Sequence, residues 1–177
     1  MNLQLKHGRI RKWRADDAAS LQRYADNRRI WINLRDIFPH PYTMANAHFF
    51  LDLVARENPP ATFAIATESE AIGCIGLRPG ADVHRRTAEL GYWLGEPFWG
   101  RGIMTEAVST FTAQAFIDFD LARLYAESFA TNEASARVLQ KAGFTCEGRL
   151  RSYVLKDGQL LDALVYAKLR DDVAQKS

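Results

Sequence analysis

The chain has 177 residues, which is enough for one domain with a sizeable core. Hydrophobic residues make up 47% of the sequence and charged residues 25%, as in an ordinary soluble globular protein. The formal net charge is +2, and the charges are interspersed apart from short basic clusters, so we expect no nucleic acid as a partner.

The sequence carries no signal for a membrane, an export route or a metal. No apolar run approaches the roughly 20 residues that span a bilayer, so no membrane partner is expected. The N-terminus lacks the apolar core of a signal peptide, and a cytoplasmic location is therefore the default. The four histidines are scattered without ligand spacing, which predicts no metal site. Cys74 and Cys146 lie in strand-like surroundings without a C-x-x-C motif, which favours two buried free thiols over a disulfide or a nucleophile.

The N-terminal residues predict strands followed by a helix. Residues 3–5 and 10–13 alternate apolar and polar side chains, which favours two short antiparallel strands or one bent strand. Asp16 is a suitable N-cap for a helix over residues 18–27. Residues 28–35 form either a short second helix or a loop.

Two prolines predict an irregular segment over residues 36–42. This aromatic segment is either the wall of a pocket or a loop packed over the core edge. Thr43 then caps a helix over residues 44–56. The predicted buried stripe of this helix consists of Phe49, Phe50, Leu53 and Val54.

The central part of the chain alternates strands and helices. Residues 61–67 and 71–77 predict a β-hairpin, and residues 87–94 predict a buried strand. A helix over residues 103–116 and a strand over residues 124–129 follow.

The C-terminal part predicts a helix and then a hairpin. Asn132 opens a helix through Lys141, and Gly143 provides the left-handed residue after its end. The runs 145–155 and 159–169 flank Asp-Gly, which is a strong hairpin signal. Hairpins at both ends with helices between them predict an α/β protein with a mixed sheet. The residues after 170 are expected to form a frayed tail.

The stretch from Glu89 to Val108 is predicted to form a strand, a glycine-bearing loop and a helix. Gly100 and Gly102 lie in the loop, and the helix begins near Ile103. The first amides of a helix lack intrahelical acceptors and carry partial positive charge, which suits a phosphate. A glycine turn that only lets the helix pack is the alternative. The P-loop and the G-x-G-x-x-G fingerprint are both absent, since Thr105 stands where a third glycine would be.

Residues 99–104, Trp-Gly-Arg-Gly-Ile-Met, resemble motif A of the GNAT acyltransferases, R/Q-x-x-G-x-G/A. That motif holds the pyrophosphate of acetyl-CoA. Trp99 replaces the usual Arg or Gln, and Met104 replaces the small residue. Both departures resemble the RimJ/RimL branch, where W-G-x-G is followed by T-E-A, and Met104 should be helical and turned into the core. The resemblance implies cofactor-binding roles for Gly100, Arg101, Gly102, Ile103, Met104 and Thr105.

Residues 132–144 resemble motif B of the same family, N-x-x-S-x-R-V-L-x-K-x-G-F, at the usual distance from motif A. Asn132 is either only an N-cap or also a partner of the pantetheine arm. The resemblance implies that Ser135 hydrogen-bonds or protonates the departing CoA thiolate, although a locally bonded serine is the alternative. Arg137 could reach CoA phosphates or be a solvated helix residue.

The two motifs together imply the GNAT acyl-CoA N-acyltransferase fold, with one domain over residues 1–177 and a core at about 9–169. This fold has a central, mostly antiparallel sheet with helices on both faces, and its fourth and fifth strands splay apart. The pantetheine arm lies in that gap, where the Trp93–Leu94 backbone would pair with it and polarise the thioester carbonyl.

Glu89 is the candidate general base, because many GNAT enzymes carry a base at the start of this strand. Partial burial should raise the pKa of its carboxyl, as a base near neutral pH requires. The alternative is an ion pair with Arg85 or Arg86. Glu106 is a weaker candidate, and Asp162 could orient acceptor groups.

The function that the resemblance implies is direct transfer of acetyl from acetyl-CoA to a primary amine, with no metal. The RimJ/RimL likeness points to a protein or peptide N-terminal amine as the acceptor. A small-molecule amine, such as an amino acid, polyamine or antibiotic, is an alternative acceptor. A second hypothesis is a non-catalytic module that binds acyl-CoA, and a third is an unrelated α/β domain. Relatives are often dimers, so a homodimer is one expected assembly.

Overall fold

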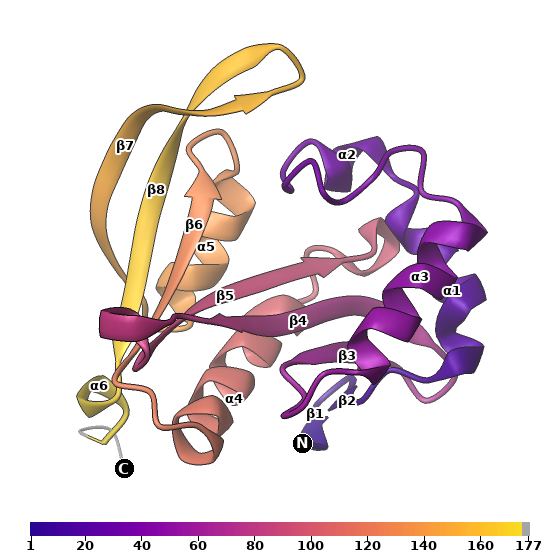
Figure 1. Cartoon of the computed structure of the whole chain (residues 1–177), viewed down its shortest axis with the longest axis horizontal. Helices are drawn as coiled ribbons and strands as arrows, with labels where there is room; N and C mark the ends of the chain where they lie inside the picture. The colour runs from indigo at the N-terminus through magenta and orange to yellow at the C-terminus, as the bar shows by residue number, and fades with distance from the viewer. Residues whose placement is uncertain (175–177) are drawn as a thin grey trace. The chain divides into compact units, whose positions relative to one another are not determined.

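A computed structural model describes residues 1–174 of the chain (Figure 1). Its strands are β1 (Leu3–Leu5), β2 (Gly8–Arg11), β3 (Thr62–Ala66), β4 (Ala71–Pro79), β5 (Thr87–Leu94), β6 (Arg123–Phe129), β7 (Thr145–Lys156) and β8 (Gln159–Leu169). Its α-helices are α1 (Ala18–Ala25), α2 (Arg28–Trp31), α3 (Met44–Ala55), α4 (Ile103–Asp118), α5 (Glu133–Lys141) and α6 (Asp171–Ala174). Short 3₁₀ helices lie at η1 (Ala15–Asp17), η2 (Asp82–His84) and η3 (Glu96–Phe98).

The strands form one mixed sheet in the order β1-β2-β3-β4-β5-β6-β8-β7. The register is antiparallel between β1 and β2, β2 and β3, β3 and β4, β6 and β8, and β7 and β8. Between β5 and β6 it is parallel and runs from Thr87↔Arg123 to Glu89↔Tyr125. The predicted fold class, a mixed and mostly antiparallel α/β sheet, is confirmed.

The chain divides into two compact units, which we describe in turn. The first unit contains residues 1–76 and 92–107, and the second contains residues 77–91 and the chain from residue 108 onward. The elements β4, β5 and α4 each contribute residues to both units.

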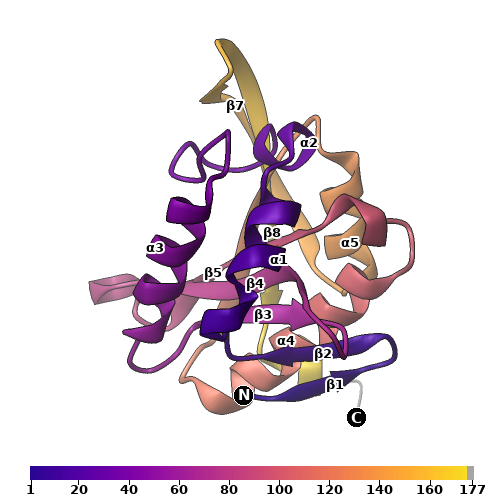
Figure 2. The ribbon, with the colours of Figure 1, turned by 90° about the vertical axis from the view of Figure 1, so that its right-hand side faces the viewer.

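In the first unit, α1 and α3 lie side by side against one small core (Figure 2). Its buried members are Ala18, Leu21, Ala25, Tyr42, Ala47 and Leu51. The stripe predicted for α3 was therefore wrong in part, because Phe49 is 71% exposed and Leu53 is 55% exposed. Ala47 and Leu51 form the face toward the core, and Phe49 lies about 200° around the helix from Ala47. Thr43 caps α3 as predicted, with its hydroxyl accepting from Asn46 N at 3.3 Å.

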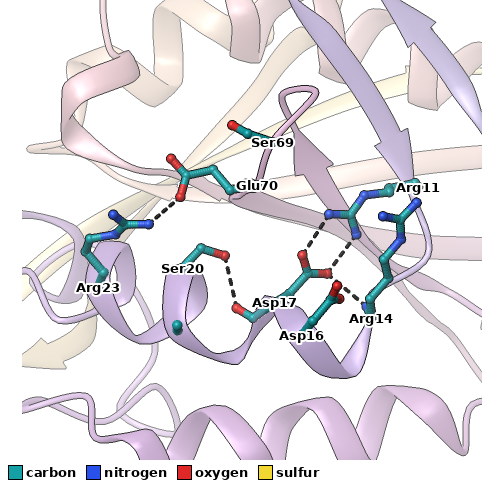
Figure 3. Close-up of a pocket in the computed structure, with 9 residues that line it drawn as sticks. Arg11, Arg14, Asp16, Asp17, Ser20, Arg23, Ser69 and Glu70 are labelled. Atoms are coloured by element: carbon teal, nitrogen blue, oxygen red, sulfur yellow. Dashed lines mark hydrogen bonds and ion pairs between the residues drawn. The ribbon is translucent and has the colours of Figure 1, made fainter.

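The start of α1 corrects a second prediction. The helix begins at Ala18 after the η1 turn, so Asp16 is not its N-cap. The buried carboxylate of Asp17 accepts two hydrogen bonds of 2.7 Å from the Arg11 guanidinium and one of 2.8 Å from Arg14 N. Arg11, Arg14 and Asp17 line a pocket together with Ser20, Arg23 and Glu70 (Figure 3).

In the second unit, β6, β8 and β7 form a three-stranded antiparallel group, with the long β7–β8 hairpin drawn in gold in Figure 1. Its turn has positive φ at Asp157 (51°) and Gly158 (74°), as a two-residue Asp-Gly turn requires. Gly143 also has positive φ (83°) directly after the end of α5, so its predicted role as the helix-ending residue is confirmed.

Both cysteines are free, but only Cys74 is buried. Cys146 is exposed on β7, the last strand in the sheet order, so the prediction of a second buried thiol was wrong. Among residues 1–174, no group of three or more His, Cys, Asp or Glu side chains is placed to hold a metal. None of the helices in the described part of the chain is long and apolar enough to cross a membrane.

Candidate active site

The end of β5 presents its backbone in two directions. Gly95 N donates to Ile72 O at 2.8 Å, which directs the amide of Gly95 toward β4. Because backbone groups alternate along a strand, the N–H and C=O of Leu94 face away from β4. Trp93 O lies so close to Gly73 that a Cβ there would be 2.5 Å from this oxygen. Leu94 is thus the residue of the predicted Trp93–Leu94 pair whose backbone is directed to a further partner.

The glycine loop is open on its outer side. Gly100 and Gly102 have φ of 74° and 77°, a left-handed conformation that favours glycine. A Cβ built on either residue would meet no atom within 4 Å. Glycines needed only for close packing would show such contacts, so the loop conformation itself is the requirement. This geometry argues against the alternative in which the glycines merely let the helix pack.

The first turn of α4 combines two buried side chains with backbone amides that lack an intrahelical acceptor. Ile103 and Met104 are buried, as predicted for Met104, and they anchor the helix in the core. Glu106 N bonds Gly102 O at 3.0 Å, so the amides preceding it have no intrahelical acceptor. These are the amides of Gly102, Ile103, Met104 and Thr105, and the positive end of the helix dipole lies with them.

Two other predicted residues near this loop are placed by local contacts. The Arg101 guanidinium is exposed and lies 5.8 Å from the centroid of the Phe98 ring. The Glu106 carboxylate accepts a 2.8 Å hydrogen bond from Lys6 N, which ties the β1–β2 turn to α4. Glu106 therefore has a structural partner within the first unit.

In the second unit, Glu89 forms an ion pair with Arg78 from β4. The Glu89 side chain is 12% exposed, whereas that of Arg78 is 62% exposed. The partners considered from the sequence were Arg85 and Arg86. Arg86 instead bonds Asp120 at 3.0 Å, and Arg85 bonds Asp82 O at 3.2 Å.

A second carboxylate, Glu127 on β6, shares this region and was missed in the sequence. Tyr125 lies opposite Glu89 in the parallel register, and Glu127 follows Tyr125 by two residues on the same, less buried face of β6. Burial raises the pKa of Glu127, the negative charge of Glu89 raises it further, and Arg78 lowers it. The pKa of Tyr125 is also raised, first by burial and then by Glu89 and Glu127. The alternating pattern of residues 123–129 was the available signal for Glu127.

The N-terminus of α5 is capped as motif B requires. The Asn132 side-chain oxygen accepts from Ser135 N at 3.1 Å, and this bond places Ser135 in the first turn of the helix. Ser135 is half-buried. Arg137 is exposed and pairs with Glu133 at 3.1 Å, one turn earlier on the helix.

Asp162 belongs to the β7–β8 hairpin. Its carboxylate accepts from Arg149 Nε at 2.6 Å and from Ser152 N at 2.8 Å. The hydrogen bond from the Ser152 backbone and then the one from Arg149 lower the pKa of this carboxyl. These contacts hold the irregular part of β7, where Ser152 has a positive φ of 49°.

The geometry described so far agrees with a family model for the acetyltransferase (GNAT) domain, which matches residues 9–145. The chain belongs to the GNAT family. The matched segment includes the β5 end, the glycine loop, α4, β6 and α5.

Curated relatives of this GNAT domain carry acetyltransferase names. The uncharacterized N-acetyltransferase YoaA of Bacillus subtilis is 41% identical over 98 residues, covering 55% of this chain and 55% of that protein. The ribosomal-protein-serine acetyltransferase of Escherichia coli is 30% identical over 109 residues, covering 62% of this chain and 60% of that protein. The spermidine N(1)-acetyltransferase of E. coli is 26% identical over 150 residues, covering 84% and 74%. The matches to the first four relatives span 53% to 61% of those proteins' own length.

Solved structures share the fold over almost the whole chain. RimJ of Mycobacterium smegmatis in complex with CoA-disulfide has a TM-score of 0.82 at 26% identity, covering 98% of this chain and 88% of that chain. RimL, a ribosomal L7/L12 α-N-protein acetyltransferase solved with coenzyme A, has a TM-score of 0.85, covering 97% and 99%. Its identity of 19% makes it evidence for the fold of the GNAT domain alone.

Proposed function

We propose that this GNAT domain is an acetyl-CoA-dependent N-acetyltransferase that transfers acetyl directly to a primary amine. The observation that carries the proposal is the open glycine loop, whose left-handed backbone precedes the amides of residues 102–105 at the start of α4. These donors fit a diphosphate, because a helix N-terminus offers unpaired N–H groups and positive potential to an anion. Acetyl-CoA would supply the activated acetyl group as a thioester.

The residues at the end of β5 and the start of α4 would orient this co-substrate. Backbone amides of residues 101–105 would hold its diphosphate, and the Arg101 side chain is exposed beside them. The Leu94 N–H faces away from β4 and would polarise the thioester carbonyl. Asn132 would hydrogen-bond the pantetheine arm while its side-chain oxygen caps α5. Arg137 would contact a phosphate at the cost of a surface ion pair with Glu133.

The proton of the acceptor ammonium has two candidate destinations. Glu89 remains the candidate general base, and Glu127 joins it because burial and the neighbouring charge of Glu89 raise the pKa of Glu127. A carboxyl with a raised pKa is a better proton acceptor near neutral pH than an ordinary one. The freed amine then attacks the thioester carbonyl carbon, forming the C–N bond as the C–S bond breaks. The nitrogen gives its second proton to solvent as the neutral amide forms.

Ser135 would complete the transfer. Its hydroxyl would give a proton to the departing thiolate, and the solvent would restore that proton. The Asn132 cap fixes the backbone of Ser135 at the first turn of α5, and this fixes the position from which the hydroxyl extends. No acyl-enzyme is proposed, because neither cysteine lies in motif A or motif B.

We further propose that the acceptor is the N-terminal amine of a protein or peptide. The similarity to RimJ at 26% identity and the match to the ribosomal-protein-serine acetyltransferase support this class. A polyamine is the second candidate, because the match to spermidine N(1)-acetyltransferase covers 84% of the chain. Both acceptors are cationic amines, and both suit a site with two carboxylates.

A CoA thiol-release assay separates these proposals. The purified protein would be incubated with acetyl-CoA and each member of a panel of N-terminal peptides, polyamines and amino acids. Release with peptides alone supports the N-terminal acceptor, and release with polyamines alone supports the second candidate. Tight binding of acetyl-CoA without release from any acceptor would favour a non-catalytic binding module. No binding of CoA would contradict membership of the enzyme class.

A further inference from the structure

The segment of residues 95–99 joins the end of β5 to the glycine loop, and it is held at Gly95 by the bond to Ile72 O and at Phe98 and Trp99 by side-chain contacts. Trp99 Nε1 donates a 2.7 Å hydrogen bond to Leu94 O, so the segment closes back on the strand that it leaves. Phe98 packs edge-on against Tyr24 of α1, with ring centroids 5.4 Å apart. The next residue along the chain is Gly100, where the open loop begins.

The same segment is held by the start of α2 through one asparagine. Asn27 accepts from Arg29 N at 2.8 Å with its side-chain oxygen, which caps α2. The side-chain nitrogen of Asn27 donates to the Glu96 carboxylate at 2.7 Å. Both polar ends of one amide are therefore used, one on α2 and one on the 95–99 segment.

Arg29 repeats this link with two further contacts. Its guanidinium forms an ion pair with Glu96 and also lies 5.2 Å from the centroid of the Trp99 ring. Trp99 is thus in contact with a cation on one side of its ring and bonded to Leu94 O through its indole nitrogen. These contacts form a continuous series within the first unit, which runs from Asn27 through Arg29, Glu96 and Trp99 to Leu94.

We propose that Asn27, Glu96 and Trp99 are positioning residues that set the affinity of the glycine loop for CoA. The inference rests on the proposed function, because it assumes that the loop amides bind the CoA diphosphate. Glycines have many accessible backbone conformations, so an unrestrained loop would lose more entropy when it binds. The fastened 95–99 segment restricts the loop beforehand. Trp99 replaces the usual Arg or Gln of motif A, whose side chain could reach a phosphate. In this protein, Trp99 would instead contribute by fixing the backbone of the loop.

Two substitutions each remove a single contact from this series. Asn27→Ser keeps an N-cap oxygen for α2 but removes the amide nitrogen that bonds Glu96. Trp99→Phe keeps a ring beneath Arg29 but removes the indole N–H. Each variant should raise the dissociation constant for CoA about three- to tenfold, the range expected for the loss of one hydrogen bond.

The kinetics should separate the two variants. Asn27→Ser should raise the KM for acetyl-CoA while kcat at saturating acetyl-CoA stays within about twofold, since it weakens binding in the ground state and the transition state equally. Trp99→Phe should raise this KM and also lower kcat, because Leu94 is both the bond partner of Trp99 and the proposed donor to the thioester carbonyl. A merely structural role would produce neither pattern.

Glu70→Gln is the matched control. Glu70 accepts from Tyr24 Oη at 2.8 Å and forms an ion pair with Arg23, so it has the same two kinds of contact as Glu96. The exposures of the two ion pairs are also similar, at 59% and 27% for Arg23 and Glu70 against 69% and 34% for Arg29 and Glu96. Glutamine still offers Tyr24 an oxygen acceptor, so the Tyr24–Phe98 contact should be kept. This variant should therefore lose comparable stability and leave the dissociation constant for CoA unchanged.

Calorimetric titration of CoA into the wild type, Asn27→Ser, Trp99→Phe, Glu96→Gln and Glu70→Gln tests the inference. Weaker binding in the three segment variants but not in Glu70→Gln supports it. Binding by every folded variant within about twofold of the wild type, which is less than one hydrogen bond would contribute, overturns it and leaves the proposed function standing. Failure of the wild type to bind CoA would instead overturn the proposed function, and this inference with it. Asn27→Ser and Glu96→Gln are the mild changes that keep the test decisive if Trp99→Phe does not fold.

Discussion

Glu89 of β5 lies opposite Tyr125 of β6, at the end of the parallel register between these strands. β5 continues to Leu94, and β6 continues to Phe129 in register with β8. The backbone of β5 beyond Glu89 is where we propose that the pantetheine arm pairs as an added strand. The candidate base therefore stands at the point where the strand pairing ends.

The pH dependence of the reaction should distinguish Glu89 from Glu127. If Glu127 is the base, its ionised form is needed, so kcat/KM should rise with pH through the raised pKa of this group. Glu127→Gln should then lower kcat/KM by about 10²-fold or more. Glu89→Gln should move the acidic limb to lower pH, because it removes a charge that raises the pKa of Glu127.

Glu147→Gln is the control for these carboxylate variants, since Glu147 lies on the outer strand β7 and forms an ion pair with Arg123 of β6. It should leave the pH profile unchanged. An unshifted acidic limb in Glu89→Gln together with near-normal rates in Glu127→Gln would exclude Glu127 as the base.

Glu127→Gln should also stabilise the fold at neutral pH. A carboxyl whose pKa is raised in the folded state binds protons more tightly there than in the unfolded chain. Its contribution to stability is therefore favourable below the unfolded pKa and is lost as pH rises through the folded pKa. Urea unfolding at pH 5 and pH 8 measures this, and the wild type should gain stability relative to Glu127→Gln at the lower pH. Equal pH dependence in both proteins would contradict the assigned environment of Glu127.

Gly102→Ala should weaken CoA binding without disturbing the core. The left-handed backbone at Gly102 costs an alanine about 1–2 kcal/mol, although its Cβ would meet no neighbour. The loop should respond by changing conformation, and the dissociation constant for CoA should rise by about tenfold or more. Gly148→Ala is the matched control, because its Cβ is also uncontacted and its φ is not left-handed. Equal effects of the two variants on CoA binding would show that the loop conformation is irrelevant.

Asn132→Asp should separate the capping role of Asn132 from its proposed contact with pantetheine. Aspartate accepts from Ser135 N as asparagine does and suits the positive end of α5, so the melting temperature should not fall. It lacks the amide donor, so the KM for acetyl-CoA should rise about tenfold, as expected for one buried polar contact. A lower melting temperature with unchanged KM would mean that Asn132 only caps the helix. Ser135→Ala in the same assay should lower kcat and leave the KM for acetyl-CoA unchanged.

Several features could be predicted because their causes are local. The left-handed residues Gly143 and Gly158 follow from the ends of a helix and a hairpin. The caps at Thr43 and Asn132 follow from a side-chain oxygen directly before a helical pattern. The open space beside the glycine loop could not be predicted from the sequence, because it depends on which distant residues surround the loop in the fold.

Other features depend on contacts between distant residues. Asp16 is a suitable cap by residue type, but α1 begins at Ala18, and the carboxylate of Asp17 before it bonds Arg11 and Arg14 N instead of the helix. Both sides of α3 carry apolar residues, so periodicity could not choose the buried face. The alternating pattern of residues 123–129 places Glu127 on one face of a strand, but only the register that brings Tyr125 opposite Glu89 places it near Glu89. The prediction of a single domain over the whole chain stays a prediction.

The central claim is that main-chain amides at the start of α4 bind the diphosphate of CoA. A crystal structure of the protein with bound CoA tests it most directly. We predict diphosphate oxygens at about 3 Å from the amide nitrogens of residues 101–105, the usual length of such hydrogen bonds. Diphosphate bound elsewhere, with these amides facing only solvent, would contradict the account.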